Sequence, residues 1–68
     1  YDGLTDRQVE VLRLIAQGLT TQEVARRLYI SPHTVESHRE NIMSLLDLHN
    51  KAELIKYAIR KGIVDESS

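Results

Sequence analysis

The spacing of apolar residues along the chain predicts four helices, at about 6–17, 21–28, 32–46 and 51–61. In the first stretch, apolar residues recur at intervals of three and four, which places their side chains on one face of a helix. These residues are Leu12, Ile15, Ala16 and Leu19. The third stretch has its inner stripe at Val35, Ile42 and Leu46. No stretch alternates apolar and polar residues as a half-buried strand does, so we expect an all-α fold.

Local signals mark the beginnings of these helices and the ends of two of them. The predicted start residues are Thr5, Thr20, Ser31 and Asn50. At the first two, a Gln or Glu three residues later completes a capping box. Ser31 is followed by Pro32, which is favoured at the first helical position because no intrahelical bond needs its missing N–H group. Gly18 and Gly62 supply the stop signals of the first and fourth helices.

The segment from 20 to 39 is the most informative part of the chain, because it predicts two helices joined by a three-residue turn. Small Ala25 lies where two crossing helices must approach closely. Apolar residues lie where both helices turn toward a shared core, at Val24, Leu28, Ile30 and Val35. This is the pattern of a compact helix-turn-helix, whose second helix enters the major groove of DNA. Our leading hypothesis is therefore a DNA-binding module.

The length and composition of the chain limit its class. Its 68 residues are enough for a single domain, which we assign to 1–68, and the lack of cysteine excludes disulfides and thiolate metal sites. No segment approaches the ~20 apolar residues of a membrane span, and none resembles a secretory signal. We therefore expect a cytoplasmic location and no membrane partner. Because the chain opens on Tyr1 and not on Met, we expect it to be part of a longer protein.

The net charge of the chain neither indicates nor excludes nucleic-acid binding. Nine Lys and Arg residues against ten Asp and Glu residues give a net charge of −1, whereas nucleic-acid-binding domains are often basic. The total charge alone favours an ordinary solvated surface. The distribution of charge is more informative. Acidic residues lie toward the chain ends, at Asp2, Asp6, Glu10, Asp65 and Glu66. Basic residues lie in or beside the motif, at Arg26, Arg27, Arg39 and Lys51.

A longer series of residues, from 4 to 64, carries a family resemblance. It comprises Leu4-Thr5-x-Arg7, Val11-Leu12-x-Leu14-Ile15-Ala16-x-Gly18-Leu19-Thr20, Glu23-Val24-Ala25, Leu28-x-Ile30-Ser31, Thr34-Val35-x-x-His38, Asn41-Ile42 and Ala52-Glu53-Leu54. In this order the series resembles the LuxR-type helix-turn-helix, as in the output domains of NarL/FixJ-class bacterial response regulators. Two positions depart from the family pattern. Leu45 stands where a basic residue is common, and Gln8 stands where an acidic residue is usual.

The resemblance implies a bacterial transcription regulator with a four-helix output domain. Its third helix would bind double-stranded DNA, and its fourth would form a homodimer on two half-sites. The domain would be the C-terminal part of a longer response regulator, controlled by an N-terminal phosphorylated receiver domain. RNA polymerase is a further candidate partner of such a regulator.

The candidate DNA-contacting residues are Ser31, His33, Thr34, Glu36, Ser37, His38, Arg39, Glu40, Asn41 and Lys51. A helical wheel turns most of them away from the core stripe of the third helix. By the resemblance, Glu36, Ser37 and Glu40 meet base edges, where a carboxylate would accept a hydrogen bond from the cytosine N4 amino group. The alternative is that Glu36 and Glu40 form a solvated pair on an exposed face.

Arg39 is the strongest single candidate, because a guanidinium can bind a phosphate or guanine O6 and N7. Alternatively, it pairs with a carboxylate of its own helix. Ser31 and Thr34 begin the third helix, whose N-terminal N–H groups and partial positive charge favour a phosphate, although Thr34 is equally explained as a local cap. His38 is expected at the edge of the core. The remaining candidates for backbone contacts, which are equally explained as surface charge, are Arg26, Arg27 and Lys51.

The fourth helix offers a candidate dimer interface. If Leu54, Ile55 and Ala58 face the core, the outward side carries other residues. These are Ala52, Lys56, Ile59 and Ile63. Pairing through this face would compensate for the few basic residues of one copy, since two half-sites about one helical turn apart would be bound together.

Two rival classes remain at this stage. An enzyme is disfavoured, because Glu36 and Glu40 form a carboxylate pair without a pocket, and no nucleophile–base pair or phosphate loop is present. His33 and His38 lie about 140° apart around a helix, so they cannot share a metal, and we expect no metal or cofactor. The stronger rival is a helical protein-interaction module of the same fold, which the acidic third helix and the near-neutral charge favour.

Overall fold

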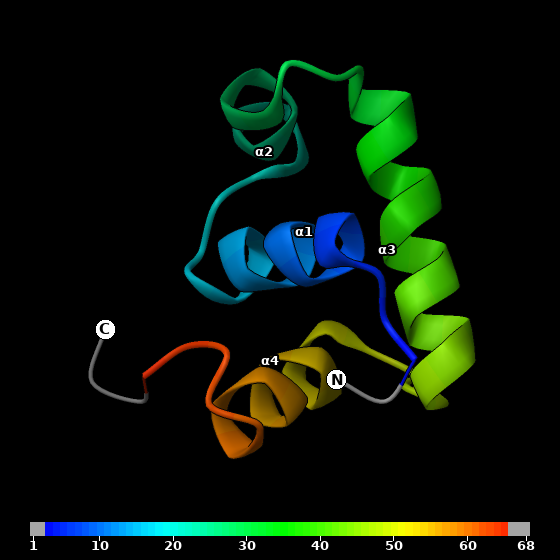
Figure 1. Cartoon of the computed structure of the whole chain (residues 1–68), viewed down its shortest axis with the longest axis vertical. Helices are drawn as coiled ribbons and strands as arrows, with labels where there is room; N and C mark the ends of the chain where they lie inside the picture. Colours follow the sequence, from blue (N-terminus) through cyan, green and yellow to red (C-terminus); the bar gives the residue numbers. More distant parts are fainter. Residues whose placement is uncertain (1–2, 66–68) are drawn as a thin grey trace.

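The computed structural model describes residues 3–65, so Asp2 and Glu66 of the acidic ends lie outside the described residues. Four helices make up this part of the chain, with no strand between them (Figure 1). They are α1 (Asp6–Ala16), α2 (Thr21–Leu28), α3 (Pro32–Leu46) and α4 (Lys51–Arg60). The predicted all-α fold is confirmed. The bounds of α2 and α3 match the prediction, while α1 and α4 each end one residue earlier than expected.

The predicted capping residues begin all four helices. Both capping boxes are present: Thr5 Oγ1 accepts from the N–H of Gln8 at 3.1 Å, and Thr20 Oγ1 accepts from the N–H of Glu23 at 3.2 Å. The side chains of these two partners in turn accept from the cap N–H groups. Short-range hydrogen bonds of this kind satisfy N–H groups that have no intrahelical partner, so sequence alone locates the helix starts.

The turn between α2 and α3 is the three-residue turn that the sequence predicts. Tyr29 ends α2 in the left-handed conformation, with φ of 59°, and the N–H of Ile30 donates to the carbonyl of Ala25 at 3.0 Å. Such a conformation is uncommon for a residue with a Cβ atom. The side chain of Tyr29 is 95% exposed, so it contributes nothing to the core.

The core forms around α1, which packs against each of the other three helices. Figure 1 shows α1 between α2 and α4, with the long α3 crossing one end of α1. Of the predicted stripe, Leu12 and Ile15 are buried, whereas Ala16 and Leu19 are half-buried and Leu19 lies beyond the end of α1. Because α1 is covered on several sides, Val11 and Leu14 are buried as well. The fully buried large side chains are Leu12, Ile42, Leu54, Val11, Val24 and Val35. Among the described residues, no helix has the length and apolar character that crossing a membrane requires.

Replacing Ile42 tests how much the buried side chain of this α3 residue contributes to the stability of the domain. Ile42→Ala removes a fully buried side chain, which costs about 2–5 kcal/mol. A domain of this size has only about 3–5 kcal/mol of stability, so we expect most of it to be lost. Urea unfolding followed by circular dichroism measures the change. Leu45→Ala is the matched control on the same helix, because Leu45 is 53% exposed, and equal losses in the two variants would contradict this packing.

Candidate nucleic-acid interface

The side of α3 opposite the core is open and polar. Val35 and Ile42 are completely buried, and the residues half a turn away point outward. Those on the open side are His33, Ser37, Glu40, Asn41 and Ser44, of which only Ser37 is half-buried. With His33 neutral, Glu40 carries the only formal charge of this set. This side can offer hydroxyl, amide, imidazole and carboxylate groups to a ligand, and we call it the outward face of α3.

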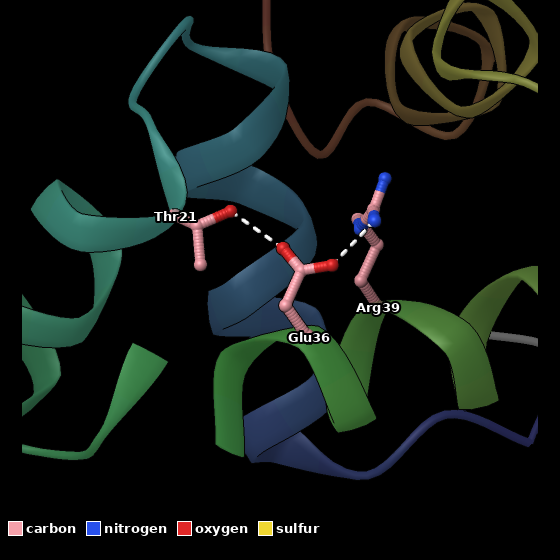
Figure 2. A network of polar contacts seen from close by, with 3 residues as sticks. All are labelled: Thr21, Glu36 and Arg39. Atoms are coloured by element: carbon pink, nitrogen blue, oxygen red, sulfur yellow. Dashed lines mark hydrogen bonds and ion pairs between the residues drawn. The ribbon is translucent and has the colours of Figure 1, made fainter. Parts of the chain in front are cut away.

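The helical wheel led us to expect Glu36 on this outward face together with Glu40. The structure places it elsewhere. Its carboxylate turns toward the start of α2, where Thr21 Oγ1 donates to Glu36 Oε2 at 2.6 Å (Figure 2). On the other side, Arg39 Nη2 donates to Glu36 Oε1 (Figure 2). The alternative that Arg39 pairs with a carboxylate of its own helix is thereby confirmed. The solvated Glu36–Glu40 pair is wrong, because the flank of α3 faces α2 and α2 supplies a donor.

The hydrogen bond from Thr21 is the main reason why the pKa of Glu36 lies below its usual range. The hydrogen bond and positive charge of Arg39 lower this pKa further, and partial burial opposes both effects. The side chains of Glu36 and Arg39 remain 37% and 40% exposed. Solvent therefore screens the pair, and its contribution to stability is modest.

Arg39 and Lys51 line a common hollow of about 200 Å³ at the starts of α2 and α4. Its other lining residues are Ile15, Leu19, Thr20, Thr21, Met43 and Leu54. Arg39 Nε is buried without a hydrogen-bond partner, and one terminal nitrogen of the same guanidinium points away from Glu36 (Figure 2). Two cations at the rim of one hollow form a suitable environment for an anion such as a phosphate group.

The other predicted contact residues lie in three places. Ser31 and Thr34 bond to each other at the start of α3: their hydroxyl oxygens lie 2.9 Å apart, and Ser31 Oγ accepts from the N–H of Thr34 at 3.1 Å. The structure thus supports the local-cap explanation of Thr34. His38 is half-buried, as expected at the edge of the core. Arg26 and Arg27 are exposed in the last turn of α2 and do not line the hollow of Arg39 and Lys51.

Sequence reasoning did not single out Thr21. Thr21 precedes Glu36 by 15 positions, and in the sequence it is only the residue that follows the predicted cap Thr20. The side-chain partner becomes recognisable only when α2 and α3 are packed together.

The predicted dimer face on α4 needs three corrections. Ile63 is not exposed on it: the chain turns back after Gly62, the N–H of Ile63 donates to the carbonyl of Ala58 at 2.9 Å, and Ile63 is only 6% exposed. Ile55 does not face the core, because Tyr57 is buried beside Leu54 and Ala58 in its place. Ile59 is half-buried and packs partly against the core, so it is not fully outward as predicted. The outward side carries exposed Ala52 and Lys56 and half-buried Ile55, with Ile59 at its edge. We call these four residues the α4 face.

Comparison with known proteins identifies the family. The family model described as "Bacterial regulatory proteins, luxR family" matches residues 2–58. The chain is 53% identical over 60 residues to the uncharacterized response regulatory protein YgeK of Escherichia coli (strain K12), covering 88% of this chain and 41% of YgeK. It is 44% identical over 62 residues to the oxygen regulatory protein NreC of Staphylococcus haemolyticus (strain JCSC1435), covering 91% of this chain and 29% of NreC.

The chain therefore belongs to the luxR family of bacterial regulatory proteins, and it carries the DNA-binding helix-turn-helix of that family, which is not a family of enzymes. The resemblance drawn from the sequence motifs is confirmed. The chain spans less than half the length of these relatives.

The pH dependence of stability tests the contact between Thr21 and Glu36. Because folding lowers the pKa of Glu36, its ionised form stabilises the protein above the usual Glu pKa of about 4.3, and this stabilisation is lost as the pH falls through the lower folded value. We expect Thr21→Val to lower the free energy of unfolding by about 0.5–1 kcal/mol at pH 7 and by less in acid. Urea titrations at several pH values measure the difference.

A Glu36→Gln background provides the control for that measurement. Without an ionisable group at position 36, the cost of Thr21→Val should no longer change between neutral and acidic pH. A cost that varies with pH to the same extent in both backgrounds would assign the dependence to another group.

Proposed function

We propose that this domain binds double-stranded DNA with sequence preference and regulates transcription, with α3 in the major groove. The observation that carries the proposal is the outward face of α3, a polar surface held away from the core by Val35 and Ile42. A helix of this kind, preceded by a short helix and a tight turn, has the shape that major-groove recognition requires.

Within this proposal, the outward face contacts base edges. Ser37 and Asn41 can donate and accept hydrogen bonds, and the carboxylate of Glu40 can accept one from the cytosine N4 amino group. The contacts to the sugar–phosphate backbone come from Lys51 and from the start of α3, including Ser31. Backbone contacts of this kind supply register and salt-sensitive affinity, while base contacts supply sequence choice.

We further propose that two copies pair through the α4 face and bind two half-sites. One copy presents few cations to DNA, since the whole chain has a net charge of −1. Binding to two half-sites about one helical turn apart would compensate for weak single-site affinity. The exposed small side chain of Ala52 permits close approach of a second helix, and half-buried Ile55 adds apolar surface.

The named relatives support a wider assignment of the domain. YgeK is a response regulatory protein by name, and the part of it that matches is 41% of its length. We propose that this chain is the C-terminal output domain of a longer cytoplasmic response regulator in a bacterium. An N-terminal receiver domain would control it by phosphorylation, and RNA polymerase would be a partner at the promoter.

One observation favours a second function, a protein-interaction module of the same fold. The outward face of α3 carries the negative charge of Glu40 and no Lys or Arg, and Leu45 is exposed where the family resemblance leads us to expect a basic residue. An acidic helix with an exposed leucine suits a basic or apolar protein surface as well as a DNA groove. This alternative predicts no salt-sensitive binding to duplexes.

Lys51→Gln tests the backbone contact and separates the two functions. We expect the affinity for every duplex to fall, and the slope of log K against log salt to decrease in magnitude by about 0.9, the value for one lost phosphate contact. Fluorescence titrations against single half-site duplexes between 50 and 200 mM salt provide the slope. Lys56→Gln removes the same charge from the same helix on the α4 face, and we expect its slope to equal that of the unsubstituted domain. Salt-independent or absent binding would support the interaction module.

Ala52→Arg tests pairing through the α4 face. Ala52 is exposed, so the change leaves the core intact, but the larger charged side chain blocks close approach of a second copy. We expect binding to a two-half-site duplex to lose its cooperativity, while binding to one half-site does not weaken. Gln17→Arg adds the same charge at an exposed position outside this face and should preserve cooperativity. Equal cooperativity in the two variants would exclude this surface as the dimer contact.

A further inference from the structure

The contact between Thr21, Glu36 and Arg39 is separate from both the core and the outward face of α3. Thr21 is the first residue of α2, whereas Glu36 and Arg39 lie one turn apart on α3. All three side chains meet on the flank of α3 that faces α2 (Figure 2). The position of Glu36 is one that the family resemblance assigns to base contact, yet its carboxylate is turned toward the protein.

We propose that Thr21 and Arg39 hold Glu36 away from the bases, so that Glu36 is a positioning residue for Arg39, and that Arg39 contacts a phosphate beside Lys51. This inference rests on the proposed DNA binding. It moves base recognition to the outward face of α3, where Glu40 is the remaining carboxylate.

The hydrogen bonds of Glu36 make its reorientation toward a base unfavourable. Each carboxylate oxygen already accepts from one donor, Oε2 from Thr21 and Oε1 from Arg39. Turning outward would break both contacts and would bring a negative charge closer to the DNA phosphates. It would also remove a partner from a guanidinium whose Nε is already buried without one. The two contacts are partly exposed, so breaking them has a modest cost, and the repulsion between the Glu36 carboxylate and the phosphates adds to it. The observed orientation should therefore persist in a complex.

The same contact orders Arg39. A long side chain loses rotamer freedom when it binds, and a side chain already held by a carboxylate loses less. Glu36 bonds to one terminal nitrogen, and a guanidinium nitrogen that points away from Glu36 remains for another acceptor (Figure 2). Arg39 and Lys51 line one hollow, so a phosphate there would meet two cations from two helices. A base edge on the outward side of α3 would meet neither.

Selection of bound duplexes from a random pool provides the first test. Glu36→Ala should select the same base at every position as the unsubstituted 68-residue chain, with any change in affinity uniform across duplexes. Arg39→Ala should also retain the preferences while reducing the salt slope by about 0.9. Glu40→Ala is the matched control, because it removes a carboxylate from the outward face and should relax the preference at one base pair by roughly 5- to 150-fold.

Three results would overturn the inference. A base preference lost in Glu36→Ala would make Glu36 a reading residue. A preference lost at a guanine in Arg39→Ala would assign Arg39 to a base and not to a phosphate. Failure of the unsubstituted chain to bind any duplex would overturn the proposed function and this inference together.

A second test needs no DNA. Carboxyl-carbon NMR titration of the free domain should show the pKa of Glu36 moving up toward its usual range in Thr21→Val, because the Thr21 hydroxyl is the main cause of its depression. Glu23 is the internal control: its pKa is lowered mainly by Thr20, so it should not move. An unchanged Glu36 pKa would show that Thr21 does not hold the carboxylate, and would overturn the inference while leaving the proposed DNA binding intact.

Discussion

The burial of α1 against the three other helices is the constraint on which the rest of the structure depends. With α1 at the centre, each outer helix needs only one apolar side, and its opposite side is free for other chemistry. For α3 the apolar side is Val35 and Ile42, both completely buried. The core is small and its stability is only about 3–5 kcal/mol, so few of these contacts are dispensable. The orientation of the outward face of α3 therefore depends on the same packing that keeps the domain folded.

Polar contacts determine the orientation of side chains that core packing does not fix. The core determines which side of α3 points outward, but it does not determine how a side chain on the flank is oriented. Thr21 does this for Glu36 with one hydrogen bond, and Glu36 does it for Arg39 with an ion pair. At 37–40% exposure these contacts add little to the free energy of folding, because water competes for the same groups. Their main effect is to choose among rotamers, and this choice decides which groups a DNA duplex would meet.

The charge distribution gives the domain an unusual character for a nucleic-acid-binding protein. With ten acidic and nine basic residues, it has no net positive charge to attract a polyanion. Two of its cations, Arg39 and Lys51, line one hollow, and in the proposed complex their placement would matter more than the total charge. Few phosphate contacts would make a single copy bind weakly, and the proposed pairing through the α4 face would then contribute to affinity together with α3.

The sequence by itself determined the four helices, their first residues and the helix-turn-helix, because each signal acts within a few positions: Thr5 and Thr20 bond to groups three residues away, and Val35 and Ile42 recur at helical spacing. Only the tertiary structure decided that Thr21 would bond to Glu36, that Tyr57 and not Ile55 would enter the core, and that Ile63 would fold back against Ala58. A helical wheel gives the angle of a residue relative to its own apolar stripe. It does not say how widely neighbouring helices cover the flanks or where the chain turns after a helix ends, and those contacts come from residues distant in sequence.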